Sequence, residues 1–427
     1  MHTLLFLDPG HFHAALTLRE PRPRVSPEIF VYAPGGSEGQ GLELRDFLAL
    51  VERFNGRAER PTRWRPVVIA DGDPLARLIE ERRGDVVVLA GRNGGKARTF
   101  RRLHEAGFHV LADKPWLVEP EDLADVRASL AEWPIVMEIM TGRHDVAARL
   151  FKRLVDSRDL FGDFRSDGPA IELASLHQLE KLVDGAPLRR PAWYFDVRVQ
   201  GGGAVDISTH VVDQTQWLLE GRGVAPLEPR LDSARQWATP VPLEAFRRIT
   251  GQGEFPPELR SRVRGDVLDY FCNAELAYRI GDVAARASVS WNLSTPPGAG
   301  DTSTTVARGT RADVLMERAA HTGYRRKLLV QPHDVAQQVV TDVVAAIEAD
   351  FPGLGVTPAE DGRYEVTMPK TLDTGHESQF ARVLDELLRL VGDRRWPAAR
   401  AERALAKYTL LAEAAARVRD DAPVPGG

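Results

Sequence analysis

The sequence has few of the features that mark secreted or membrane-anchored proteins. Its single cysteine, Cys272, cannot form an internal disulfide, and the apolar run around it indicates a buried side chain. No window approaches the roughly 20 apolar residues that a membrane-spanning helix needs. The first residues, MHTLLFLDPGHFH, contain too short an apolar run for a signal peptide. We therefore expect a cytoplasmic protein with no membrane partner.

An excess of charge of one sign is also absent. The 56 basic and 61 acidic residues are interspersed, and the net charge is -5, so nucleic acid is not an expected partner. Hydrophobic residues make up 43% and charged residues 27% of the 427 residues, which is typical of globular proteins. A chain of this length predicts two or three compact units, of which we expect two.

The first 140 residues alternate short apolar runs with amphipathic segments, a pattern typical of strand-helix units feeding a parallel sheet. The predicted strands are residues 3–7, 29–33, 67–69, 85–90, 108–112 and 135–137. The run KARTFRRLHEAG, at 96–107, predicts a crossover helix. After the second strand we expect an insertion, with the loop PGGSEGQG followed by the helix LELRDFLALVERFN.

From about residue 143 the pattern changes. Helical sequence runs to residue 160, and β-rich segments follow at 170–176, 270–280 and 284–291. We predict a domain at 1–140, an α+β second domain with an antiparallel sheet at 141–375, and a helical carboxyl-terminal segment at 376–427 that packs on the body. Pro397 is predicted to separate two helices in that segment.

The turn after the first strand, DPGHFH, occupies the place of the glycine-rich phosphate loop of a dinucleotide-binding fold. Only the middle glycine of G-x-G-x-x-G is present, as Gly10, where a bare backbone lets a pyrophosphate approach. The end of the second strand, FVYAP, offers no carboxylate for a ribose. The alternative is a tight turn whose His11 and His13 are satisfied by local hydrogen bonds.

The fifth strand ends in Asp113 and Lys114, at the sheet edge where ligands of open α/β folds bind. Pro115 cannot continue a sheet ladder, and a cis bond before it would fix how Lys114 projects. The alternative interpretation is an ordinary surface ion pair.

The run GGGAVDISTHVVD predicts a triple-glycine turn, from Gly201, that leads into a helix ending near Leu219. Asp206 and His210 are four residues apart, so we expect them on one helix face as a general-base pair. Alternatively, Asp206 favours the helix amino terminus through the dipole, or the two form a plain i,i+4 pair. Metal ligation by Asp206, His210 and His177 is a minor alternative, and we assign no metal.

Five further residues are candidates for binding substrate. Aromatic side chains stack on sugar faces, and basic side chains bond hydroxyl or carboxylate groups. The candidates are Trp193 and Tyr194 for stacking, and Arg143, His177 and Lys181 for polar contacts. For each of them a structural role in the core is the alternative.

Together these motifs resemble the Gfo/Idh/MocA oxidoreductases, whose patterns are E-K-P and G-G-G-x-x-x-D-x-x-x-H. The matching runs are AGRN with Asn93, ADKPW, and GGGAVDISTHVVDQTQWLL. Asp113 stands in place of Glu, and Asp206 comes one position early. The chain also resembles a subgroup with a distinctive carboxyl-terminal domain, through GRN, LRRPAWYFD and WNLSTPPGAGD. The resemblance covers most of the chain.

The resemblance implies a Rossmann-like first domain, a second domain with an open antiparallel sheet, NAD or NADP as cofactor, and a homo-oligomer. The implied substrate is a sugar, a cyclitol or a related polyol. His210 would accept the hydroxyl proton, Lys114 would stabilise the developing alkoxide, and Asp206 would orient His210. The implied cofactor-binding residues are Gly10, His11, His13, Asn93, Asp113, Lys114 and Pro115.

Two alternatives to net oxidation stay open. A transient ketone would acidify the neighbouring carbon-hydrogen bond and permit redox-neutral glycoside cleavage or epimerisation. The departures at Asp8 and His13 from the phosphate loop instead favour a non-catalytic ligand-binding homologue that has lost its affinity for the cofactor.

Overall fold

The computed structural model describes residues 1–35, 41–130, 133–183, 186–224, 229–293 and 300–420. Residues 36–40 of the predicted loop and 294–299 of the WNLSTPPGAGD run lie outside these ranges. The chain divides into two units. Unit 1 comprises residues 1–144, 198–201 and 375–408, and unit 2 comprises residues 145–197, 202–374 and those from 409 onward.

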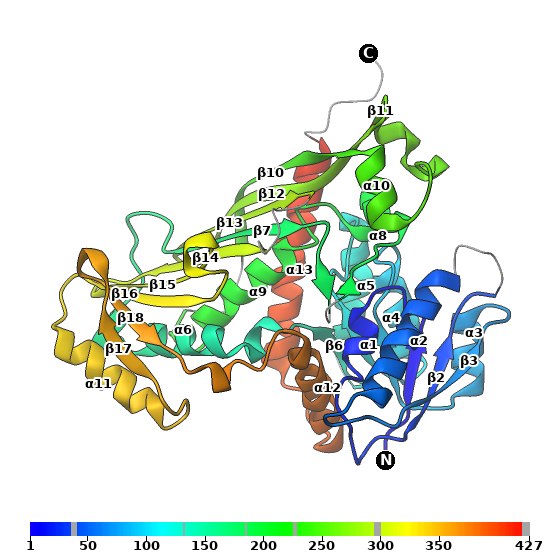
Figure 1. Ribbon diagram of the computed structural model, residues 1–427, viewed down its shortest axis with the longest axis horizontal. Coiled ribbons are helices and arrows are strands. Elements are labelled where there is room, and N and C mark those ends of the chain that lie inside the picture. The colour runs from blue at the N-terminus through cyan, green and yellow to red at the C-terminus, as the bar shows by residue number, and fades with distance from the viewer. Residues whose placement is uncertain (36–40, 131–132, 184–185, 225–228, 294–299, 421–427) are drawn as a thin grey trace. The chain divides into compact units, whose positions relative to one another are not determined.

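Unit 1 is built on a six-stranded parallel sheet in the order β3-β2-β1-β4-β5-β6 (Figure 1). Its strands are β1 (Leu4–Leu7), β2 (Glu28–Tyr32), β3 (Arg65–Ile69), β4 (Val86–Leu89), β5 (His109–Asp113) and β6 (Val136–Ile139). Each predicted strand is confirmed to within two residues at either end. The order reverses between β1 and β4, and open α/β sheets bind ligands at such a point.

Helices of unit 1 bury the sheet, and every residue of β1, β4 and β5 is buried. They are α1 (His13–Leu16), α2 (Gly41–Gly56), α3 (Pro74–Glu81), α4 (Lys96–Glu105), α5 (Leu123–Leu130) and α12 (Glu377–Gly392). Phe6 and Val31 of the sheet pack in one cluster with Leu16, Phe54 and Leu384 from α1, α2 and α12. Burial of both faces explains why these strands read as continuous apolar runs.

Unit 2 contains a ten-stranded sheet in the order β10-β12-β13-β7-β14-β15-β16-β18-β17, with β11 paired to β12. Its strands are β7 (Ile171–Gln178), β10 (Pro229–Pro242), β11 (Val263–Arg264), β12 (Val267–Ile280), β13 (Val283–Asn292), β14 (Thr302–Arg308), β15 (Ala312–Arg318), β16 (Lys327–Pro332), β17 (Gly355–Pro358) and β18 (Tyr364–Thr367). The pairing is antiparallel except between β13 and β7, which run parallel, so the sheet is mixed. A short hairpin of β8 (Leu182–Val183) and β9 (Ala186–Pro187) is separate.

The helices of unit 2 are α6 (Val146–Asp156), α7 (Arg158–Phe161), α9 (Ser208–Leu219), α10 (Leu243–Thr250) and α11 (Gln337–Glu348). Helix α9 packs on β12 and β13. The boundary between the units falls inside α8 (Val197–Gln200) and again inside α13 (Ala398–Asp420). Pro397 lies between α12 and α13, which confirms the predicted separation of two helices. Among the described residues, no helix is both long and apolar enough to cross a membrane.

Candidate active site

Lys114 lies at the carboxyl edge of the sheet of unit 1, directly after β5. Asp113 and Lys114 are only 4% and 6% exposed. The alternative interpretation of an ordinary surface ion pair is therefore wrong. The Lys114–Pro115 peptide bond is cis. A buried lysine and a buried carboxylate at this edge are candidates for binding or catalysis.

Two histidines from the turn after β1 meet the carboxylate of Asp113. The Nδ1 atom of His13 lies 2.8 Å from Oδ2 of Asp113, and Nδ1 of His11 lies 3.4 Å from the same oxygen. The backbone N–H of Lys114 donates to the other oxygen, Oδ1, at 3.0 Å. The partner of His13 is therefore not local, because Asp113 follows it by 100 residues.

Burial controls the charge of this cluster. It lowers the pKa of His13 to about 3, so the imidazole is neutral at pH 7. Burial alone would raise the pKa of Asp113, but His13 and His11 hold that pKa well below its usual value. The cluster thus keeps a charged carboxylate next to a neutral imidazole.

A second buried lysine, Lys96, ties the end of β5 to the start of α4. Its Nζ donates to the carbonyl oxygen of Asp113 at 2.9 Å and to Oδ1 of Asn93. The Asn93 side chain in turn donates to the carbonyl oxygen of Gln200 at 2.7 Å. Lys96 was not among the predicted site residues, although two glycines before it signal a turn at the sheet edge. Contact between Asn93 and a cofactor stays a prediction.

The turn after β1 differs from a glycine-rich loop in its hydrogen bonds as well as its residues. The backbone N–H of His11 donates to the carbonyl of Ala90 at 2.9 Å. Asp8 adopts a left-handed conformation, with φ 43°, and pairs with Arg92 at 3.1 Å. Gly91 approaches closely, because an added Cβ would lie 2.4 Å from the carbonyl oxygen of Asp8. Phosphates at this turn would therefore depend on side chains as well as on backbone amides.

The residue after the Lys114–Pro115 pair is anchored by the carboxyl-terminal helix. Trp116 is buried, and its backbone N–H donates to the hydroxyl of Tyr408 at 3.0 Å. The Tyr408 hydroxyl donates to the carboxylate of Glu138 on β6, which also pairs with Lys407. This buried network fixes the backbone next to Lys114.

In unit 2 the glycine turn is pressed against a strand. A Cβ at Gly203 would lie 2.4 Å from the carbonyl carbon of Asn273 on β12, and a Cβ at Gly202 would lie 2.4 Å from Oε1 of Gln236. The N–H of Gly203 donates to the carbonyl of Phe271 at 3.0 Å. Close packing on the backbone of β12 therefore requires glycine at position 203, whatever chemistry follows, whereas the neighbour of Gly202 is the end of the Gln236 side chain on β10.

The helix after this turn begins later than predicted. Helix α9 starts at Ser208, so Asp206 lies in the preceding turn, and the prediction of one shared helix face for Asp206 and His210 is wrong. A pairing of Asp206 with His210 stays a prediction. His210 lies on the less buried side of α9, with Gln214 and Trp217, whereas Asp206 is buried. The orienting role of Asp206 stays a prediction.

A polar cluster of unit 2 brings two predicted residues together. His177 Nδ1 and Lys181 Nζ each lie 3.5 Å from Oδ2 of Asp301, and the imidazole rests 5.0 Å from the Trp291 ring. Burial alone would raise the pKa of Asp301, but His177 and Lys181 hold it well below its usual value. Asp301 was not among the predicted site residues, although it ends the WNLSTPPGAGD run.

The other predicted binding residues have different surroundings. Tyr194 is buried, and the guanidinium of Arg190 lies 4.4 Å from its ring centroid, so its surroundings favour the core role. Trp193 is half-buried beside it, with 6.5 Å between the two rings. In unit 1, Arg143 lies half-buried in the short helix after β6.

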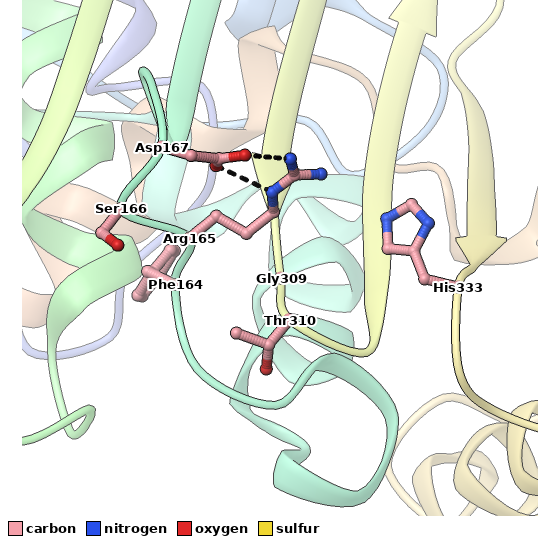
Figure 2. A pocket seen from close by; sticks show the side chains of 7 residues that line it. All are labelled: Phe164, Arg165, Ser166, Asp167, Gly309, Thr310 and His333. Atoms are coloured by element: carbon pink, nitrogen blue, oxygen red, sulfur yellow. Dashed lines mark hydrogen bonds and ion pairs between the residues drawn. The ribbon is translucent and has the colours of Figure 1, made fainter.

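A hollow of about 390 Å³ in unit 2 lies elsewhere. It is lined by Phe164, Arg165, Ser166, Asp167, Gly309, Thr310 and His333. Figure 2 shows Arg165 and Asp167 directed toward one another, with 3.0 Å between Nε and Oδ1. Because this guanidinium is already paired with a carboxylate, we do not include the hollow in the candidate site.

The strand order of unit 1 defines an α/β protein of the Rossmann-like class. Residues 150–418 match the family described as "Putative oxidoreductase C terminal domain". The chain belongs to this family of Gfo/Idh/MocA-type oxidoreductases. It is similar, at 32% identity and a TM-score of 0.91, to a "putative oxidoreductase from Parabacteroides merdae ATCC 43184", over 99% of this chain and 98% of that one.

More distant solved structures share the fold. The 3-ketoreductase KijD10 from Actinomadura kijaniata, solved with NADP and TDP-benzene, has 16% identity and a TM-score of 0.55 over 96% of this chain and 95% of that one. Levoglucosan dehydrogenase, solved with NADH and L-sorbose, has 14% identity and a TM-score of 0.59 over 98% of this chain and 97% of that one. A search of curated proteins finds no match.

Proposed function

We propose that this oxidoreductase uses NAD or NADP to transfer hydride at a CH-OH group of a sugar, a cyclitol or a related polyol. The observation that carries the proposal is the buried Lys114 at the carboxyl edge of a 3-2-1-4-5-6 sheet, in the place of the lysine of E-K-P. The residues at this edge fit a dinucleotide, because the bare Gly10 lies at the reversal point and polar side chains surround it. The proposed holding residues are Gly10, His11, His13, Asn93, Asp113, Lys114 and Pro115.

When bound, the nicotinamide ring supplies the carbon that accepts or returns hydride. The ammonium of Lys114 stabilises negative charge on the substrate oxygen, and burial of Lys114 strengthens that interaction. His210 accepts the hydroxyl proton, and Asp206 orients its ring. The substrate carbon is thereby oxidised to a carbonyl while the cofactor is reduced.

The cluster of His177, Lys181 and Asp301 supports a polyol substrate. It combines an imidazole and an ammonium that each lie 3.5 Å from one carboxylate oxygen of Asp301, and the imidazole lies next to the Trp291 ring. Such side chains bond hydroxyl groups, and an aromatic ring covers the apolar face of a sugar. We include Arg143, Trp193 and Tyr194 as further substrate contacts in the proposal.

The proposal is tested first by thermal shift with NAD and NADP. Binding at 100 times Kd stabilises the folded state by about 2.7 kcal/mol, which raises Tm measurably. A shift with either cofactor supports the proposal, and no shift with both favours a binder that has lost cofactor affinity.

Product analysis then separates net oxidation from redox-neutral chemistry. With an excess of oxidised cofactor and a panel of glycosides and cyclitols, net oxidation accumulates reduced cofactor and ketone in equal amounts. Cleavage or epimerisation without reduced cofactor would instead identify the redox-neutral alternative. A homo-oligomeric, cytoplasmic enzyme is also part of the proposal, and light scattering and cell fractionation test those two parts.

A further inference from the structure

The cluster of His11, His13 and Asp113 brings three ligand atoms of different side chains to one point. Among the described residues, one ring nitrogen of each histidine and one carboxylate oxygen of Asp113 all lie within 4.8 Å of one another. The two measured separations from Asp113 Oδ2 are 2.8 Å and 3.4 Å. A metal ion bound at about 2.0–2.2 Å places neighbouring ligand atoms about 2.8–3.6 Å apart. Both separations therefore suit ligands of one ion.

The donor set selects a class of ion. Two imidazole nitrogens and one carboxylate oxygen suit Zn²⁺, Fe²⁺ or Co²⁺, whereas Mg²⁺ and Ca²⁺ prefer oxygen ligands throughout. Three protein ligands also leave coordination positions for water or for an oxygen atom of another ligand, as in catalytic rather than purely structural sites.

The surroundings hold the three side chains in place. The side chains of Asp113, His13 and His11 are only 5%, 12% and 16% exposed. Asp113 is oriented by the N–H of Lys114 on its second oxygen, and the ring of His13 packs 4.4 Å from that of Phe380. Fixed rings and a hydrogen-bonded carboxylate are the outer contacts that metal ligands usually have.

We propose that His11, His13 and Asp113 bind one divalent transition-metal ion. The competing explanation is a metal-free network in which both imidazoles donate to the carboxylate. That network gives no tight binding of a transition metal, so the two explanations differ in a direct measurement. Ion binding is measured without dinucleotide, so its failure is separate from a failure of the proposed function.

The test uses the untagged full-length chain, because a histidine tag binds metal. The protein is stripped with a chelator, and Co²⁺ is titrated while its visible d-d absorption is recorded. We expect one equivalent to bind and an equivalent of Zn²⁺ to displace it. Loss of an outer contact typically weakens metal binding by roughly 10–100-fold. His11→Ala and His13→Ala each remove a proposed ligand, so each should raise the Kd for Co²⁺ by more than that.

The matched control is His2→Ala. His2 Nδ1 lies 2.6 Å from Oδ2 of Asp85, and this pair has no third ligand among the residues that the structure describes, so Co²⁺ binding should not change. His13→Cys adds a second signature, since a thiolate ligand produces a sulfur-to-cobalt charge-transfer band. Circular dichroism shows whether each variant is folded. Wild-type protein that binds no stoichiometric Co²⁺, or folded His11 and His13 variants that bind it as wild type does, would overturn the proposal.

Discussion

The indole of Trp116 lies parallel to the phenol ring of Tyr408, with 5° between the ring planes and 5.2 Å between the centroids. Trp116 follows the Lys114–Pro115 pair, and Tyr408 comes almost 300 residues later, at a sequence separation of 292. The backbone that presents Lys114 is thus held by the carboxyl-terminal helix of the chain.

Tyr408→Phe should test this anchor. The variant keeps the stacked ring but removes the hydroxyl that accepts from the N–H of Trp116 and donates to Glu138. Leaving a buried polar group unsatisfied costs about 1–3 kcal/mol, and we expect the free energy of unfolding in urea to fall by that amount. Tyr364→Phe, at a half-buried position, is the control, and equal losses in the two variants would contradict the anchor.

Gly203→Ala should be strongly destabilising. The added methyl group would lie 2.4 Å from backbone atoms of Asn273, which cannot move as the end of a flexible side chain can. Overpacking typically costs about 1–3 kcal/mol, so we expect at least that loss in denaturant unfolding. At Gly253 an added Cβ meets nothing within 4 Å, so Gly253→Ala should leave stability almost unchanged.

Lys114→Met should lower kcat by about 10²–10³, as loss of a group that stabilises an oxyanion does. His210→Asn should lower it by about 10²–10⁴, the usual contribution of a general base. Steady-state kinetics on the substrate found by product analysis measures both. Lys370→Met, at an exposed lysine, controls for loss of charge. If Lys114→Met raised only KM, the lysine would be a binding residue instead.

Asp301→Asn should raise KM about tenfold and leave kcat nearly unchanged. The substitution removes the charge that holds His177 and Lys181 in place. We expect those two side chains to bind the substrate equally in the ground state and in the transition state, and loss of such binding raises KM without changing kcat. Asp313→Asn disrupts a different histidine-carboxylate pair in the same unit, that of His333, and serves as the control. A fall in kcat at constant KM would place Asp301 in the chemical step.

Glu386 should make stability depend on pH in the acid range. Burial alone would raise its pKa, but hydrogen bonds from His144 and Arg400 lower it to about 2. Its usual value is about 4.3, so the stabilisation is complete above that pH and is lost as the pH falls towards 2. We expect the free energy of unfolding of the wild type, measured in urea, to be about 1–2 kcal/mol above that of Glu386→Gln at pH 6. Near pH 2 the two free energies of unfolding should be almost equal. A difference that is constant with pH would exclude this role.

The parallel sheet was predictable because its strands are buried on both faces. Runs such as DVVVLA and FHVLA are apolar throughout, so local sequence marks them. Strand β10 was not predicted, because PRLDSARQWATPVP is largely polar and lies at the edge of its sheet, where only some side chains are buried. The local sequence also did not mark Ser208 as the start of α9.

The sequence marked Asp113, His11 and His13 separately but could not show that they meet. Their contact depends on how β1, β4 and β5 are aligned in the sheet, and no local pattern carries that alignment. Asp301 was missed for a similar reason, because its partner His177 belongs to a distant strand.

The close approach of Gly203 to β12 bears on how this enzyme can be re-engineered. A mutational library that includes Gly203 would lose the clones with a larger residue there, since even one methyl group collides with the strand behind it. Trp193 and Lys181, two of the proposed substrate contacts, are half-buried and are the positions to vary for new substrate preferences. The segment that leads to His210 is best kept as an invariant frame in any such selection.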